Sequence, residues 1–302
     1  MTPDKIIKEQ LDYSGITAWH EAGITGEGVV IWNAETNTRE HGRISERRIK
    51  DAAPGATVIS AEQFMRYDNE RIIEESVTYQ GKKYSTEEFI KAFNIKVVNK
   101  SKSGSKTLGV LSPFWKRLRD TYGLILCNAV GNEGEGDWGG AIPYDCAIYV
   151  GAASLFKGKP KRDYYSSVTN ELDFMQFTGT WSGTSFSSPC LAGMAALLAQ
   201  VKPTIMQEEA YDYFVSHAED MQIDGPDEYT GYGLAKMGSI GEDWEENEVI
   251  TKTKVKVNGK VVEVNRILKN GENYIRLRDL ETPLGICKVD YDAKAKMPII
   301  ED

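Results

Sequence analysis

One stretch decides the fold, Trp181-Ser182-Gly183-Thr184-Ser185-Phe186-Ser187-Ser188-Pro189-Cys190-Leu191-Ala192-Gly193-Met194-Ala195-Ala196-Leu197-Leu198. A polar loop runs directly into a long segment rich in Ala and Leu. Pro189 falls in the first turn of the helix that this segment predicts, where backbone N–H groups have no partner within the helix and a proline is tolerated. This pattern predicts a buried central helix with Ser185 at its N-terminus. Backbone N–H groups there favour negative charge, which suits a serine that creates an oxyanion by attacking a carbonyl. A serine that only caps the helix is the alternative.

A second motif, Thr25 to Thr36, is a Gly-rich turn followed by a short apolar run that ends in Glu35. The run predicts a buried strand. His41 follows six residues after Glu35, where we expect a helix to begin. Of the three histidines, His20, His41 and His217, only His41 follows a strand and precedes a helix. It is therefore the candidate general base of a serine-dependent hydrolase. A histidine that merely starts a helix is the alternative.

A third motif, Gly131-Asn132-Glu133-Gly134, follows the apolar run 124–130. A carboxamide on a tight, Gly-flanked turn after a strand can donate an N–H to a developing oxyanion. Taken alone, an asparagine in a turn is the simpler interpretation.

The composition sets limits on the function. The chain has 302 residues, 41% of them hydrophobic, which is enough for one large domain and a small one. Its net charge of -9 argues against nucleic acid as the main partner. No apolar run approaches the 18 residues of a membrane helix, and Met1–Gln10 lacks the apolar core of a signal peptide. We therefore expect no membrane partner. The protein is expected to be cytoplasmic or released without a Sec signal, and a phage-encoded protein is one such case.

The four cysteines, Cys127, Cys146, Cys190 and Cys287, show no CxxC or zinc-finger spacing. Three of them lie in apolar surroundings, so the sequence predicts buried free thiols rather than disulfides or a zinc site. No metal site and no cofactor are expected.

Together these motifs resemble the signatures of the subtilases, the subtilisin-like serine proteases. Their nucleophile motif is Gly-Thr-Ser followed by Pro-His-Val-Ala-Gly, and this chain reads Pro-Cys-Leu-Ala-Gly, with Cys190 in place of a packing histidine. The resemblance covers residues 13 to 238 with all landmarks in family order. It implies an α/β fold, a doubly wound and mainly parallel sheet with the active site at the carboxyl ends of the strands.

The resemblance also implies roles for four residues in a serine endopeptidase that forms an acyl-enzyme. Ser185 is the nucleophile, His41 the general base, Glu35 the triad acid and Asn132 an oxyanion donor. The family strand Thr-Gly-x-Gly-Val-x-Val-Ala-Val-Ile-Asp-Thr aligns without a gap when Glu35 replaces its Asp. A competing register puts Asn33 there and needs a two-residue gap. After His41 the family's second histidine and small residues are lost.

The segment Ile95–Gly104 resembles the family strand Val-Ile-Asn-x-Ser-Leu-Gly, which pairs with the substrate backbone as an edge strand. This likeness implies a protein or peptide substrate and the contact residues Val98, Ser101, Lys102, Ser103, Gly104, Ala129 and Gly131. Calcium ions belong to what the resemblance implies, but the sequence assigns no site to them. Between the landmarks, residues 64–93 read as an insertion with a charged helix, a hairpin around Gln80-Gly81 and a helix opened by a capping box at Ser85.

The chain changes character after residue 240. We expect a peptidase domain over 1–240, an acidic linker over 241–248 and a small β-rich domain over 249–302. Two Asn-Gly turns between alternating runs predict hairpins there, and the segment carries 11 Lys and Arg against 8 Asp and Glu. It weakly resembles the small β-domain at the N-terminus of some copper amine oxidases and in many cell-wall amidases. A cell-wall or protein partner is expected through it.

Two other functions compete with the protease. The departures around Glu35 and His41 favour a pseudoprotease that binds peptides on the strand Ile95–Ser101. The appended domain and the missing signal favour a structural component, such as a phage-associated protein. We also expect either a trimmed precursor segment or folding without one, because secreted subtilases begin with a propeptide.

Overall fold

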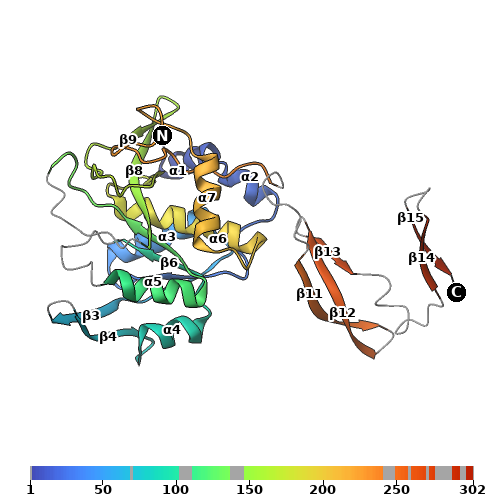
Figure 1. Cartoon of the computed structure of the whole chain (residues 1–302). Helices are drawn as coiled ribbons and strands as arrows, with labels where there is room; N and C mark the ends of the chain where they lie inside the picture. Colours follow the sequence, from blue (N-terminus) through green and yellow to red (C-terminus); the bar gives the residue numbers. More distant parts are fainter. Residues whose placement is uncertain are drawn as a thin grey trace. The chain divides into compact units, whose positions relative to one another are not determined.

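The computed structural model describes residues 2–68, 71–101, 111–136 and 146–240, and five strands of the C-terminal segment (Figure 1). The chain divides into two compact units, Met1–Gly238 and Ser239–Asp302. The predicted acidic linker, 241–248, lies outside the described residues.

The first unit is built on a seven-stranded sheet in the order β10-β8-β7-β6-β1-β2, with β9 beside β8. All pairs are parallel except β8 with β9. This confirms the predicted α/β fold with a mainly parallel sheet. The strands are β1 (Val30–Asn33), β2 (Thr57–Ser60), β6 (Val97–Lys100), β7 (Ile125–Ala129), β8 (Ile148–Phe156), β9 (Lys159–Arg162) and β10 (Phe174–Phe177).

Helices cover both faces of this sheet, as two neighbouring residues of β1 show. Trp32 packs against Phe89 of α4 (Thr86–Phe93) and Trp115 of α5 (Leu111–Tyr122), with ring centroids 5.1 and 5.9 Å away. Asn33 points to the opposite face and accepts a hydrogen bond from Ser45 of α3 (Glu40–Ala52). A parallel sheet buried on both faces explains the continuous apolar runs in the sequence.

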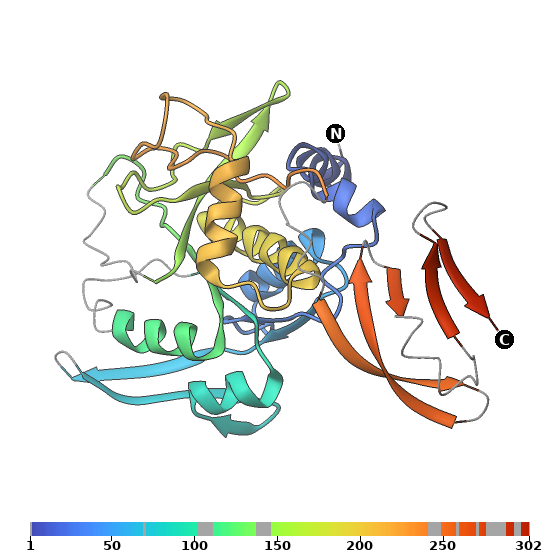
Figure 2. The ribbon, with the colours of Figure 1, turned by 45° about the vertical axis from the view of Figure 1, so that its right-hand side comes forward.

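The predicted central helix is α6 (Ser188–Val201), which is buried from Ser188 to Ala199. Figures 1 and 2 show it running through the middle of the first unit, behind α7 (Gln207–His217). Gly193 lets α3 cross closely, because a Cβ there would lie 2.6 Å from the Ala52 Cβ and 2.9 Å from the Ile49 carbonyl oxygen. Two further helices, α1 (Pro3–Tyr13) and α2 (Ile16–Glu21), precede β1.

The insertion between β2 and β6 differs in part from the prediction. It contains three antiparallel strands, β3 (Gln63–Asp68), β4 (Arg71–Tyr79) and β5 (Lys82–Tyr84), and then α4. The hairpin and the capping box of Ser85 with Glu88 are confirmed. The prediction of a charged helix before them is wrong, because strands β3 and β4 lie there. The charges there pair across strands instead, since Glu74 lies 3.6 Å from Arg66 and 3.1 Å from Lys83.

The described part of the second unit contains five strands. A three-stranded antiparallel sheet is formed by β11 (Val249–Val257), β12 (Lys260–Lys269) and β13 (Glu272–Ile275), and β14 (Lys288–Asp292) pairs with β15 (Met297–Glu301). The domain boundaries that the sequence suggests stay a prediction.

Three cysteines of the first unit, Cys127, Cys146 and Cys190, are buried free thiols, and burial raises the pKa of Cys127 and Cys190. Cys287 lies outside the described residues. Within the described ranges, no helix combines the length and the apolar character needed to span a lipid bilayer.

Candidate active site

The candidate site lies where the strand order reverses. The chain goes from β1 to β2 on one side, and from β6 through β7 and β8 to β10 on the other. In open α/β sheets, ligands bind outside the carboxyl ends of the strands at such a point. Glu35 follows the end of β1 here, Ser101 follows β6 and Asn132 follows β7.

The structure brings Glu35 and His41 together. Glu35 Oε2 lies 3.5 Å from His41 Nδ1, with side chains 12% and 44% exposed. This separation is an ion-pair distance, longer than a usual hydrogen bond. Gly42 makes the close approach possible, because a Cβ there would lie 1.9 Å from the Thr36 carbonyl oxygen. The short loop between Glu35 and His41 therefore folds directly against the first turn of α3.

Ser185 lies in a short 3-10 turn, η2 (Thr184–Phe186), just before α6 begins at Ser188. Its Oγ donates a hydrogen bond to the Ser101 carbonyl oxygen over 3.1 Å. The His41 ring packs against the ring of Phe186, 5.2 Å between centroids, so the histidine contacts the residue that follows Ser185 in the sequence. No hydrogen bond between Ser185 and His41 occurs among the described residues. Such bonds are often long in enzymes without substrate.

Asn132 is held by the turn that carries the serine. Its Oδ1 accepts hydrogen bonds from the Thr184 backbone N–H, at 2.9 Å, and from Thr184 Oγ1, at 3.2 Å. Because a backbone N–H can only donate, the amide must present its oxygen to Thr184. The Nδ2 group is then directed elsewhere on an exposed side chain, and no described residue accepts a hydrogen bond from it.

The predicted substrate contacts need correction. The residues Val97–Lys100 form an interior strand, paired with β1 on one side and β7 on the other, and do not form an edge. Val98 is fully buried in the hydrophobic core, so it cannot contact a substrate. Ala129 is also buried. Three of the contact residues, Lys102, Ser103 and Gly104, lie outside the described residues.

The two other contact residues have partners within the protein. Gly131 holds Thr184, since its N–H and its carbonyl oxygen each lie 3.2 Å from Thr184 Oγ1. Ser101 is 5% exposed and accepts the hydrogen bond of Ser185. Both residues therefore contact the turn Thr184–Phe186 that carries Ser185, through hydrogen bonds that the sequence did not reveal.

A group of buried polar residues lies beneath the site and was not predicted from the sequence. Asn33, Ser45, Asn99 and Ser188 are fully buried and joined by hydrogen bonds. A signal was present, because Asn33 and Asn99 each interrupt an apolar strand. Polar side chains in such positions need hydrogen-bond partners.

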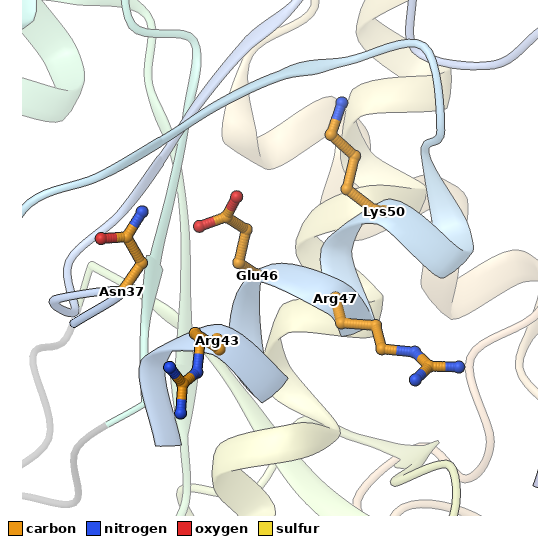
Figure 3. Close-up of a pocket in the computed structure, with 5 residues that line it drawn as sticks. All are labelled: Asn37, Arg43, Glu46, Arg47 and Lys50. Atoms are coloured by element: carbon orange, nitrogen blue, oxygen red, sulfur yellow. The ribbon is translucent and has the colours of Figure 1, made fainter. Parts of the chain in front are cut away.

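A pocket of about 340 Å³ lies at α3 and the loop before it (Figure 3). Asn37, Arg43, Glu46, Arg47 and Lys50 line it. Figure 3 shows Arg47 pointing away from Glu46 and Lys50, so the cationic groups do not converge. Glu46 accepts a hydrogen bond from Ser60 Oγ over 2.7 Å. Helical spacing puts the pocket on the solvated side of α3, opposite the buried Ser45. None of the predicted catalytic residues lines this pocket.

Within the described part of the chain, no group of three or more His, Cys, Asp or Glu side chains is placed to hold a metal ion.

Comparison with known sequences agrees with the motifs. A sequence model of the subtilase family matches residues 23–233. Subtilisin NAT of Bacillus subtilis subsp. natto is 30% identical over 136 residues, 40% of this chain and 34% of that protein. Subtilisin J of Geobacillus stearothermophilus is 29% identical over 165 residues, 49% of this chain and 42% of that protein. The chain thus matches less than half the length of either relative.

Solved structures show the same fold. A lanthipeptide protease aligns with a TM-score of 0.54 and 16% identity, covering 78% of this chain and 95% of that chain. MycP1 without its N-terminal propeptide aligns with a TM-score of 0.56 and 15% identity, covering 76% and 94%. Since the family model spans well over half of the 302 residues, the chain belongs to the subtilase family of serine proteases.

Proposed function

We propose that this chain is a serine endopeptidase with Ser185 as nucleophile, His41 as general base and Glu35 as the acid that orients the histidine. One observation supports this assignment above the others. Glu35 Oε2 lies 3.5 Å from His41 Nδ1, and the same imidazole packs on Phe186, the neighbour of Ser185. A carboxylate at Nδ1 leaves Nε2 as the proton acceptor that a serine nucleophile needs.

The reaction then follows the acyl-enzyme route. Ser185 Oγ attacks the scissile carbonyl carbon while its proton passes to His41 Nε2. The C–N bond of the tetrahedral intermediate breaks, and the imidazolium returns the proton to the leaving amine. Water, deprotonated by His41, then attacks the acyl ester and frees Ser185. Before attack, the hydroxyl must leave the Ser101 carbonyl oxygen and turn toward His41.

The oxyanion needs donors fixed in advance. Asn132 Nδ2 suits this role, because Thr184 holds the amide oxygen and leaves the N–H₂ group directed away from the turn. The backbone N–H of Ser185 is the second donor we propose. Preformed donors of this kind stabilise the transition state without reorganising during the reaction.

Peptide binding without catalysis is the second candidate. The observation that favours it is the hydrogen bond from Ser185 to Ser101, which ties up the hydroxyl. In that case the chain binds peptides but leaves them intact.

Hydrolysis of a mixed peptide library, followed by mass spectrometry, separates the two. The control is Ser182→Ala, because Ser182 is an exposed serine three residues away. We expect wild type and Ser182→Ala to cleave, and Ser185→Ala to lose cleavage by a factor of about 10⁶. If wild type binds peptides but does not cleave them, the result would support peptide binding without catalysis. If Ser185→Ala cleaves as well as wild type, Ser185 is not the nucleophile.

A further inference from the structure

A cluster of buried polar side chains lies directly beneath the candidate active site. We call it the polar hub: Asn33 of β1, Ser45 of α3, Asn99 of β6 and Ser188 of α6. All four are 0% exposed. They come from four different elements, and each side chain points into the layer between the sheet and the helices α3 and α6.

Hydrogen bonds join the polar hub into one network. Asn33 Oδ1 accepts from Ser45 Oγ and from Asn99 Nδ2, each over 2.9 Å. Asn99 Oδ1 accepts from Ser188 Oγ over 2.8 Å. Asn99 Nδ2 also donates to Ser101 Oγ over 3.0 Å. The two amide oxygens are therefore satisfied without water, as buried polar groups require.

Three members of the polar hub are close in sequence to a proposed catalytic residue, and the fourth, Asn99, contacts Ser101. Asn33 precedes Glu35 by two residues, and Ser45 follows His41 by four, which is one helical turn. Ser188 opens α6, three residues after Ser185. Asn99 acts through Ser101, whose carbonyl oxygen accepts the Ser185 hydroxyl. The network thus ties together the separate elements that carry the acid, the base and the nucleophile.

We propose that the polar hub is a positioning device that holds Glu35, His41 and Ser185 in catalytic register. Stability alone does not account for it, because replacing a buried hydrogen-bonded pair by apolar side chains of similar shape is nearly neutral. Hydrogen bonds have directions and lengths that apolar contacts lack, and catalytic groups must be held to within about 0.5 Å. This inference rests on the proposed protease function and adds the residues that maintain its geometry.

The test replaces the Asn33–Ser45 pair by apolar side chains. In the double variant Asn33→Val/Ser45→Ala, Asn99 loses its hydrogen bonds to Asn33 and Ser45 but keeps those to Ser101 and Ser188. We expect kcat to fall ten- to hundredfold, since small misplacements of catalytic groups have effects of this size. KM should stay within about twofold and Tm within a few degrees, because only the catalytic register is lost.

A matched control removes a comparable hydrogen bond elsewhere. Ser14 is 1% exposed, and its Oγ donates to Gln176 Oε1 over 3.3 Å. Ser14→Ala therefore deletes one buried hydrogen bond from a serine to a side-chain amide. Ser45→Ala deletes the equivalent bond to Asn33 and, in addition, the contacts of Ser45 Oγ with Asn99 Nδ2 and Ser101 Oγ, each at 3.2 Å. The control should lower Tm and leave kcat unchanged. A double variant with wild-type kcat would overturn the proposal, and so would a Ser14→Ala variant that loses as much kcat.

Crystal structures of wild type and variants give a readout that needs no activity. We expect the distances from Glu35 Oε2 to His41 Nδ1 and from Ser185 Oγ to the Ser101 oxygen to lengthen in the double variant. If wild type fails to cleave peptides, the proposed function fails, but these distances still decide the role of the polar hub. Unchanged distances would refute it. If the double variant does not fold, the single variant Ser45→Ala decides by the same measurements.

Discussion

Glu35 has one methylene group more than an aspartate, and it reaches His41 from a loop two residues past the end of β1. An amide at this position cannot stabilise an imidazolium or hold the histidine in the required tautomer. We therefore expect Glu35→Gln to lower kcat by about 10³- to 10⁴-fold with little change in Tm. The control is Glu40→Gln, because Glu40 is exposed in the same first turn as His41. Equal activity of the two variants would exclude Glu35 as the acid.

A second prediction concerns Asn132. Asn132→Ala removes the proposed oxyanion donor, so kcat should fall by about 10²- to 10³-fold with little change in KM. Steady-state kinetics on a short peptide measures both constants. Asn37→Ala serves as control, because Asn37 is an exposed asparagine that lines the pocket on α3. A drop in Tm with full turnover would reduce Asn132 to a residue that only supports Thr184.

The sequence pointed to the proposed catalytic residues because each lies in a recognisable local pattern, and their roles stay a prediction. Ser185 precedes an Ala- and Leu-rich helix, and His41 lies in the first turn of the helix that follows β1. The assignment of Val98 was wrong because its exposure depends on pairing with β1 and β7, which are distant in sequence. The polar hub escaped prediction for the same reason, since its bonds join four elements.

Asp173 links strand β8 to helix α7. Just before β10, its Oδ2 accepts from the Tyr149 N–H of β8 over 2.7 Å, and its Oδ1 accepts from the Tyr211 hydroxyl of α7 over 3.0 Å. Burial raises the pKa of Asp173 from 3.8 to about 6, although these hydrogen bonds lower it. The folded state therefore holds this proton at pH values where the unfolded chain has lost it.

This shift sets a pH dependence of stability. Because the folded pKa is the higher one, the Asp173 carboxyl opposes folding at neutral pH, and that penalty disappears as pH falls through 6 toward 4. Relative to Asp173→Asn, wild type should gain about 2 to 3 kcal/mol of unfolding free energy between pH 7 and pH 4. Urea denaturation of both proteins at several pH values measures the difference. A difference that is flat, or that falls toward pH 4, would contradict the prediction.

Elements were predicted well where local signals were strong and poorly where they were ambiguous. The capping box at Ser85 set the start of α4 correctly. The charged residues of β3 and β4 led to the prediction of an exposed helix, because charged side chains face solvent in helices and in strands alike. Only the cross-strand pairing, such as Arg66 with Glu74, distinguishes the two.

The proposed catalytic groups all belong to the unit Met1–Gly238. A domain with its own core usually folds alone. We therefore expect residues 1–240 to be soluble and to cleave short peptides with a kcat/KM within about twofold of the full chain. If residues 249–302 serve attachment, as the sequence leads us to expect, binding to a cell-wall preparation or protein partner should be lost. Insolubility or loss of cleavage in the truncated protein would mean that the second unit completes the catalytic one.

The most direct test of the central claim is covalent labelling by a fluorophosphonate, which reacts with serines activated as nucleophiles. Ser185 Oγ should displace fluoride from phosphorus, so the intact mass of folded wild type should rise by one phosphonyl group. Peptide mapping should locate that group on Ser185, and Ser185→Ala should stay unlabelled under the same conditions. Folded wild type that stays unlabelled between pH 7 and 9, or a Ser185→Ala variant labelled as fast as wild type, would contradict the assignment.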